Sequence, residues 1–281
     1  MKIARTVSDL RDHVLKWRAS NESIGLVPTM GALHEGHLSL IKIAQARCTK
    51  VITTIFVNPR QFLPNEDFET YPRSEPDDIQ KLINENVDVL FAPPVSEMYR
   101  PNASTTVSVS NLTNCLCANH RPGFFDGVGT VVTKLLIQAL PDIAVFGEKD
   151  YQQLLVIKNL SKDLDVPVEI IGAPTIRESD GLAVSSRNVY LTPQDRRVAP
   201  NLFRVLKTTA TSIASGKPTS MALSKALYEL EVSGFKKIDY FDARDSETLE
   251  TLSDQDISGR LFSAVWLGST RLIDNIPIQQ Y

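Results

Sequence analysis

Apolar residues in the first 176 positions fall into short continuous runs that alternate with stretches of helical spacing. Runs rich in β-branched residues, such as VITTIFV, predict buried strands, and apolar residues that repeat every three or four positions predict helices. The predicted strands lie in segments 23–29, 51–59, 87–94, 142–150 and 168–174. The predicted helices cover 37–48, 75–86, 127–140 and 151–164, and the valines of 127–140 also permit a strand.

This alternation predicts an α/β domain with a parallel sheet and right-handed crossovers. Near-continuous apolar strands fit a sheet that helices cover on both faces. In such sheets ligands bind beyond the carboxyl ends of the strands. The segments that follow four of the strands are polar or rich in glycine, and we expect them to surround one cleft: PTMGALHEGH, VNPRQF, FGEKDYQQ and GAPTIRESDGLAVSSRN.

The pattern changes after Asn188, where two helical segments are followed by three short segments with strand character. These are 192–215 and 220–234, and then 237–245, 261–268 and 270–275. Helices followed by short antiparallel strands predict a smaller α+β domain. We therefore divide the chain into domains of residues 1–176 and 177–281, with the linker near 174–190.

Composition and charge narrow the class of protein. Of the 281 residues, 42% are hydrophobic and 22% are charged, as in ordinary globular proteins. The net charge of −3 argues against a nucleic-acid partner, because such proteins usually need a basic excess. The N-terminal residues lack the apolar core of a signal peptide, and no run approaches the length of a membrane span. We therefore expect no membrane association and a cytoplasmic location.

The three cysteines are Cys48, Cys115 and Cys117, which do not form the regular framework of a disulfide scaffold. The pair Cys115-x-Cys117 could supply half of a metal site, but the other half is missing. Buried or incidental thiols are therefore the favoured interpretation.

The segment HEGH, residues 34–37, follows a predicted strand and leads into a predicted helix. Unpaired N–H groups and the macrodipole at a helix start attract anions. Residues three apart share a helix face, so His34 and His37 can both donate hydrogen bonds to the charge that grows on a phosphate in a transition state. Gly36 lacks a Cβ and lets a flat ring or a phosphate approach. A pair of capping or surface histidines is the alternative.

Two further segments offer cations and donors for phosphate. In AVSSRN, the hydroxyls of Ser185 and Ser186 can donate, and the guanidinium of Arg187 can bind two oxygens. In GEKD, Lys149 can neutralise phosphate charge, and Asp150 can bind ribose hydroxyls or the shell of a magnesium ion. A polar linker and an exposed charged loop are the respective alternatives.

Two glutamines are candidates for binding a small polar substrate. Gln61 is flanked by aromatic residues in a strand-end loop, and Gln153 lies at the start of a predicted helix, where its neighbour Gln152 should point elsewhere. For any single glutamine, a side chain that faces solvent is the alternative.

Six strings in this order resemble the pantothenate synthetase (pantoate–β-alanine ligase) family: VPTMGALHEGHLSLI, FVNPRQF, YPR, FGEKDYQQL, DGLAVSSRN and WLGSTRLIDN. HxGH alone marks a wider superfamily of nucleotidyl transferases, and the full set is much more specific. The resemblance implies a Rossmann-like doubly wound domain, a smaller C-terminal lid domain and a homodimer. It also implies two steps with magnesium: ATP and (R)-pantoate form pantoyl adenylate, and β-alanine then displaces AMP to give pantothenate.

The resemblance further implies roles for single residues. His37, the family's proton donor, and His34, Lys149 and Arg187 form the catalytic set. Gln61 contacts pantoate and β-alanine, and Gln153 contacts pantoate. The residues implied in ATP binding are Met30, Gly31, Ala32, Leu33, His34, Glu35, Gly36, His37, Gly147, Glu148, Lys149, Asp150, Ile176, Val184, Ser185, Ser186 and Arg187.

One position departs from the family, which commonly has a histidine where RPGFF has Phe124. We expect activity to be retained, because the other segments match.

One alternative function is a nucleotidyl transferase with a phosphorylated acceptor, against which the neutral amides of Gln61 and Gln153 argue. The other is a non-catalytic nucleotide-binding protein, against which the intact catalytic set argues.

Overall fold

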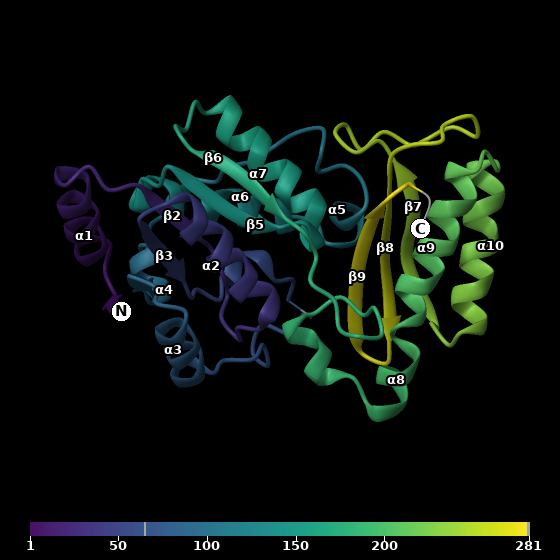
Figure 1. Ribbon diagram of the computed structural model, residues 1–281, viewed down its shortest axis with the longest axis horizontal. Coiled ribbons are helices and arrows are strands. Elements are labelled where there is room, and N and C mark those ends of the chain that lie inside the picture. The colour runs from purple at the N-terminus through teal and green to yellow at the C-terminus, as the bar shows by residue number, and fades with distance from the viewer. Residues whose placement is uncertain (65, 280–281) are drawn as a thin grey trace. The chain divides into compact units, whose positions relative to one another are not determined.

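The computed structural model describes residues 1–64 and 66–279 and divides the chain into two units (Figure 1). Unit 1 comprises Met1–Asn111, Arg121–Glu148 and Gln152–Pro174, and unit 2 comprises Leu112–His120, Lys149–Tyr151 and the chain from Thr175 onward. Unit 2 thus includes two short segments from the predicted first domain. Its long C-terminal stretch begins at residue 175, whereas the predicted second domain begins at residue 177.

Unit 1 is built on a six-stranded sheet in the order β1-β4-β3-β2-β5-β6, in which neighbouring strands are parallel. Its strands are β1 (Lys2–Ala4), β2 (Ile24–Val27), β3 (Lys50–Thr54), β4 (Val89–Phe91), β5 (Ile143–Gly147) and β6 (Glu169–Ala173). Strands β2 and β4 are buried throughout, as expected where helices cover both faces of a sheet. The predicted parallel α/β class is therefore confirmed, and β1 is a strand that the pattern did not predict.

The helices of this part of the chain include the four that the pattern predicted and two that it did not, at Val7–Ala19 and Val95–Met98. They are α1 (Val7–Ala19), α2 (Glu35–Arg47), α3 (Glu75–Asn84), α4 (Val95–Met98), α6 (Phe124–Ala139) and α7 (Tyr151–Asp163). The valine-rich segment that also permitted a strand lies in α6. Most residues of this helix from Phe125 to Ala139 are buried, and a largely apolar helix is stable where it is enclosed.

The strand order reverses between β2 and β5. From β2 the chain moves outward through β3 and β4, and it then returns to place β5 on the other side of β2, with Leu26 paired to Ala144. The loops that leave β2, β3 and β5 therefore begin side by side at one edge of the sheet. In open parallel sheets, ligands bind at such a reversal point.

Unit 2 contains a three-stranded antiparallel sheet, β7-β8-β9, and helices α9 and α10 lie against it (Figure 1). Its elements are α5 (Cys117–His120), α8 (Pro193–Val198), α9 (Asn201–Ala214), α10 (Thr219–Val232), β7 (Lys237–Arg244), β8 (Arg260–Leu267) and β9 (Thr270–Pro277). The predicted smaller α+β part is confirmed. The segment 192–215, in which helical structure was predicted, contains two helices, and Pro200, which has no N–H to donate, lies between α8 and α9.

All three cysteines are buried, as favoured from the sequence. Among residues 1–64 and 66–279, no group of three or more histidine, cysteine, aspartate or glutamate side chains lies close enough to hold a metal. In the same part of the chain, no helix is long and apolar enough to cross a bilayer.

Gly127 of α6 lies against the 3-10 helix η1 (Pro59–Gln61), and a Cβ built on it would be 2.1 Å from the Arg60 carbonyl oxygen. We expect Gly127→Ala to lower the free energy of unfolding by about 3 kcal/mol, because the backbone must move to relieve this overlap. The control is Gly216→Ala, where a Cβ meets nothing within 4 Å and only the φ of +87° opposes alanine. Its cost should be about 1 kcal/mol, and equal losses in urea unfolding would contradict the steric argument.

Candidate active site

The two histidines of HEGH cap the first turn of α2. His34 is the N-cap residue, and its Nδ1 accepts a hydrogen bond from the Gly36 N–H at 3.1 Å. The Nδ1 of His37 accepts from the backbone N–H of His34 at 3.3 Å. The ring centroids are 4.0 Å apart and the ring planes are tilted by 32°. Two imidazoles thus form the reciprocal capping box that a hydroxyl and a carboxylate usually form.

This hydrogen bonding fixes which nitrogen of each ring carries the proton. A neutral imidazole that accepts through Nδ1 has its hydrogen on Nε2. In neutral His34 and His37 the hydrogen is therefore on Nε2, while Nδ1 accepts from the backbone. Capping and donation to an anion are compatible in this geometry, so the two interpretations of HEGH are not exclusive.

Gly36 makes room for a ring. A Cβ at this position would lie 2.9 Å from both Cε1 and Nδ1 of His34, which is closer than packed atoms approach. The absence of a side chain therefore allows the imidazole of His34 to fold back over the first turn of α2.

A buried carboxylate holds the loop between β2 and α2. Gly31 and Ala32 have φ values of +85° and +49°, and the second is unfavourable for a residue with a Cβ. Asp78, which is 1% exposed on α3, accepts from the N–H groups of Ala32 and Leu33, both at 2.8 Å. From the same helix, Lys81 Nζ donates to the Leu33 carbonyl at 2.7 Å. Neither role was predicted from the sequence.

The loop after β2 is also joined to the loop after β3. The Thr29 N–H donates to Thr54 Oγ1 at 3.1 Å, and the Phe56 N–H donates to the Thr29 carbonyl at 3.1 Å. The hydroxyl of Thr29 in turn accepts from the Gly31 N–H at 3.1 Å. These bonds fix the two strand-end segments to each other.

The structure brings Gln61 to the HEGH loop. Its Nε2 lies 3.1 Å from Met30 Sδ, and its Oε1 accepts from Asn58 Nδ2 at 2.9 Å. Because a sulfur atom is a weak acceptor, the amide is oriented while its N–H groups stay weakly bound. The end of β3 thus presents an oriented amide beside the segment that carries the histidines.

Asn58 is the support of Gln61, and sequence reasoning missed it. It is 1% exposed, and its Nδ2 also donates to the Gly127 carbonyl at 3.1 Å. Its Oδ1 accepts from the Arg60 N–H at 3.2 Å and from the Tyr99 hydroxyl at 2.8 Å. Burial raises the pKa of Tyr99 to about 12, although Arg60 and Asn58 oppose this, so the phenol keeps the proton that it donates.

Arg121 binds the backbone of Gln61. Its guanidinium donates to the Gln61 carbonyl at 3.0 Å and to both carboxylate oxygens of Glu66 at 2.6 Å. The Arg121 Cζ lies 3.8 Å from the ring centroid of Phe124, a cation–π arrangement. Phe124 therefore packs on the arginine that holds the backbone of Gln61.

The GEKD segment follows β5. Gly147 ends the strand, and Glu148, Lys149 and Asp150 form the 3-10 helix η2 (Glu148–Asp150) before α7 begins. On α7, Gln152 is 5% exposed and belongs to the buried side of the helix. Gln153 is half-buried.

The predicted linker is a hairpin. The Val184 N–H donates to the Ile176 carbonyl at 3.0 Å, and Gly181, with a φ of +94°, lies at the turn. Arg177 binds both carboxylate oxygens of Asp274 on β9, at 2.6 and 2.9 Å. The hairpin leads into the 3-10 helix η3 (Ser186–Tyr190), where the Ser185 hydroxyl accepts from the Arg187 N–H at 3.3 Å.

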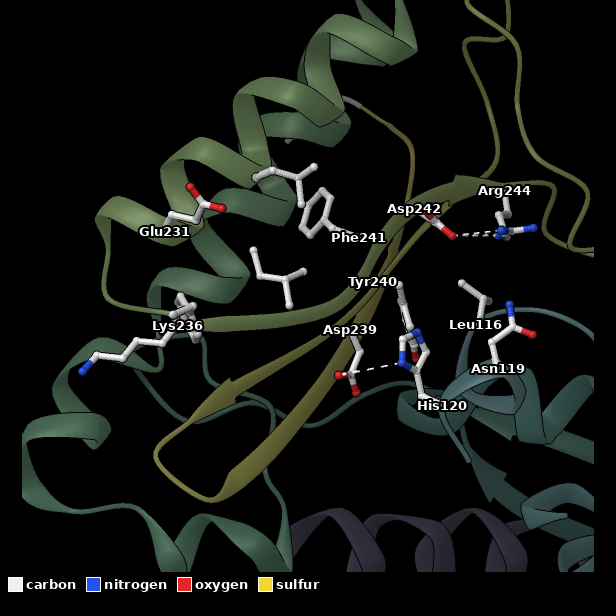
Figure 2. A pocket seen from close by; sticks show the side chains of 13 residues that line it. Leu116, Asn119, His120, Glu231, Lys236, Asp239, Tyr240, Phe241, Asp242 and Arg244 are labelled. Carbon is white, nitrogen blue, oxygen red and sulfur yellow. Dashed lines mark hydrogen bonds and ion pairs between the residues drawn. The ribbon is translucent and has the colours of Figure 1, made fainter. Parts of the chain in front are cut away.

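Figure 2 shows a different feature of unit 2, a cavity of about 550 Å³. Among the side chains that line it, His120 Nδ1 is 3.9 Å from Asp239, and Arg244 binds Asp242 at 2.9 Å. The residues described as lining it include none of the predicted site residues.

The role of Asp78 can be tested by changing one atom of its side chain. We expect Asp78→Asn to lower the free energy of unfolding by about 2 kcal/mol, because the amide NH2 faces a backbone N–H that the carboxylate now accepts. Asp77→Asn on the same helix turn is the control, since Asp77 is exposed. Chemical denaturation measures both, and a loss of less than about 0.5 kcal/mol for Asp78→Asn would remove Asp78 as the support of the loop.

Comparisons with known proteins identify the family. A sequence model described as pantoate-beta-alanine ligase matches residues 2–277. The pantothenate synthetase of Caulobacter vibrioides is 51% identical over 279 residues, covering 98% of both chains, and that of Rhodospirillum rubrum is 51% identical, covering 99% of both.

Comparison with solved structures points to the same family. The pantothenate synthetase of Thermus thermophilus superposes with a TM-score of 0.93 at 43% identity, covering 98% of this chain and 99% of that one. The Francisella tularensis pantoate-beta-alanine ligase, complexed with beta-gamma ATP and beta-alanine, has a TM-score of 0.84 at 37% identity and covers 98% of this chain and 97% of that one. The chain therefore belongs to the pantoate–β-alanine ligase family.

Proposed function

We propose that this chain is an ATP-dependent ligase that condenses (R)-pantoate with β-alanine to pantothenate through pantoyl adenylate. The observation that carries the proposal is the grouping of His34, His37, Met30 and Gln61 at the ends of β2 and β3 in a chain that matches the ligase family over its whole length. The neutral amide of Gln61 suits an unphosphorylated hydroxy acid better than a phosphorylated acceptor.

In the first step, a carboxylate oxygen of pantoate attacks the α-phosphorus of ATP. The bond from the α-phosphorus to the bridging oxygen breaks, and pyrophosphate leaves with the bonding electrons. Negative charge grows on the phosphate oxygens, and the Nε2–H groups of His34 and His37 are the donors proposed to stabilise it. No protein nucleophile is required, so positioning and charge stabilisation supply most of the rate.

In the second step, the amine of β-alanine attacks the carbonyl carbon of the adenylate. The acyl–phosphate bond breaks, AMP leaves, and the nitrogen loses a proton as the amide forms. Gln61 is proposed to orient both pantoate and the incoming amine, and Gln153 to bind pantoate. The hydrogen bond from Asn58 supports this role, because it fixes the direction of the Gln61 amide.

Further residues are proposed to bind ATP. Lys149 and Arg187 supply positive charge for the phosphates, and the loop from Met30 to His37 supplies backbone contacts. Ile176 and Val184 occupy the paired ends of the hairpin, so its geometry supports a common role in binding the nucleotide. The remaining residues in this proposal are Gly147, Glu148, Asp150, Ser185 and Ser186.

Magnesium fits this donor set as an ion bound chiefly by substrate. Magnesium is commonly held by phosphates together with one or two carboxylates, and Asp150 offers one carboxylate in the proposed nucleotide segment. Bound in this way, the ion would neutralise phosphate charge.

We also propose a homodimer in the cytoplasm. Magnesium and the homodimer are implied by the family resemblance, and light scattering of the purified chain tests the dimer.

The proposed activity is tested by mass-spectrometric detection of pantothenate from ATP, pantoate and β-alanine, with each substrate omitted in turn. We expect product only in the complete mixture, and pyrophosphate release with ATP and pantoate alone. A preparation that forms no pantoyl adenylate at millimolar substrates would refute the proposal and the expectation that Phe124 is tolerated. Release of pyrophosphate with mononucleotide acceptors in place of pantoate would instead indicate another kind of nucleotidyl transferase.

Replacement of His37 tests the role of the imidazoles. We expect His37→Ala to lower turnover about a hundredfold, because a donor to transition-state charge is lost, and to leave ATP binding measurable. His13→Ala on α1 is the matched control and should retain full turnover. Unchanged turnover of His37→Ala would remove His37 from the mechanism.

A further inference from the structure

A buried amide on the last strand of unit 2 binds the backbone of Lys149. Asn275 of β9 is 4% exposed, and its Nδ2 donates to the Lys149 carbonyl at 2.9 Å. Its Oδ1 accepts a hydrogen bond from Nη1 of Arg260, on the neighbouring strand β8. Arginine has only donors, so the amide oxygen must face Arg260, and the NH2 group must face the Lys149 carbonyl.

The same arginine also holds the residue at the other end of this short segment. The Arg260 Cζ lies 3.7 Å from the ring centroid of Tyr151. The ring centroids of Tyr151 and Phe262 are 6.0 Å apart. Arg260 is only 8% exposed, and cation–π contacts strengthen when they are desolvated. Residues 149 and 151 are thus both fixed to β8 and β9, one through its carbonyl and one through its ring.

We propose that Asn275, oriented by Arg260, is a positioning residue that fixes Lys149 for binding the phosphates of ATP. The inference rests on the proposed function of Lys149. A lysine side chain has four flexible methylene groups, so the place where its charge can act depends on how firmly its backbone is held. A displacement of about 1 Å in such a group is enough to lower a rate strongly.

The neighbouring residue supports this interpretation of β9. Asp274, 4% exposed, binds Arg177, whose hairpin pairs Ile176 with Val184. The Oδ1 of Asp274 also accepts a hydrogen bond from the Asn275 N–H at 2.8 Å. Two consecutive residues of one strand therefore anchor two separate segments to which ATP binding is assigned.

A double-mutant cycle tests the proposal. Asn275→Asp keeps the shape of the side chain and the acceptor for Arg260, but it cannot donate to the Lys149 carbonyl. We expect it to lower kcat/KM for ATP about tenfold, with the KM for β-alanine changed less than twofold. Because Asn275 acts through Lys149, the double variant with Lys149→Ala should be no slower than Lys149→Ala alone.

Asn201→Asp is a matched control in the same unit. The Nδ2 of Asn201 also donates to a backbone carbonyl, that of Val198 at 3.1 Å, and its Oδ1 also accepts from an arginine, Arg204 Nε at 3.2 Å. It should retain kcat/KM for ATP within twofold. If Asn275→Asp does not fold, as judged by thermal unfolding, Asn275→Ser gives the same test, because its short hydroxyl does not reach the Lys149 carbonyl.

Three results would overturn the inference: losses that multiply in the double variant, no loss for Asn275→Asp, or an equal loss for Asn201→Asp. An active parent enzyme with an unaffected Lys149→Ala variant would show that Lys149 does not bind phosphate, and the inference would fail with it. An inactive parent enzyme would instead refute the proposed function itself, so the two failures are distinguishable.

Discussion

The buried carboxylate of Asp78 is the interaction on which the histidine loop depends. Between the last residue of β2 and the first residue of α2 the chain must turn sharply, and Ala32 adopts a left-handed conformation that a side chain opposes. The turn aims two neighbouring N–H groups at one point, and both oxygens of Asp78 accept them. An N–H left unpaired there would cost about 1–3 kcal/mol. The carboxylate therefore fixes where His34 begins the helix.

Side-chain amides connect the remaining segments of the candidate site. An amide carries both donors and an acceptor, so one residue can join two backbone segments or orient another amide. Asn58 bonds to Gln61, Gly127, Arg60 and Tyr99, and in unit 2 Asn275 bonds to Lys149 and Arg260. The proposed adenylation needs substrates held in the right positions more than it needs a protein nucleophile. Supports of this kind then contribute to the rate through the groups that they hold.

The parallel sheet could be predicted because long periodic segments carry strong signals, and HEGH stood out because it lies at a strand end before a helix. The three-residue strand β1 is too short for a period to show. The supports were missed for a different reason. Asp78 lies in the first turn of α3, where an acidic residue is already expected to complement the helix dipole. Its partner Ala32 is 46 residues away, and Lys149 is 126 residues from Asn275. Such pairings follow from the folded structure and leave no local pattern.

The capping box also bears on how His37 can act. The Nδ1 of His37 accepts a hydrogen bond from the His34 N–H, so a proton on that Nδ1 would place two N–H groups against each other. The same conflict would arise if the Nδ1 of His34, which accepts from the Gly36 N–H, were protonated. The two capping hydrogen bonds therefore each need a ring nitrogen Nδ1 that carries no proton. A neutral imidazole that gave up its Nε2 proton would become an anion beside the triphosphate, which charge repulsion opposes. Hydrogen bonds from Nε2–H to the growing negative charge require no such transfer. The capping hydrogen bonds of α2 are thus compatible with the proposed stabilisation by two Nε2–H donors, which needs no full proton transfer from His37.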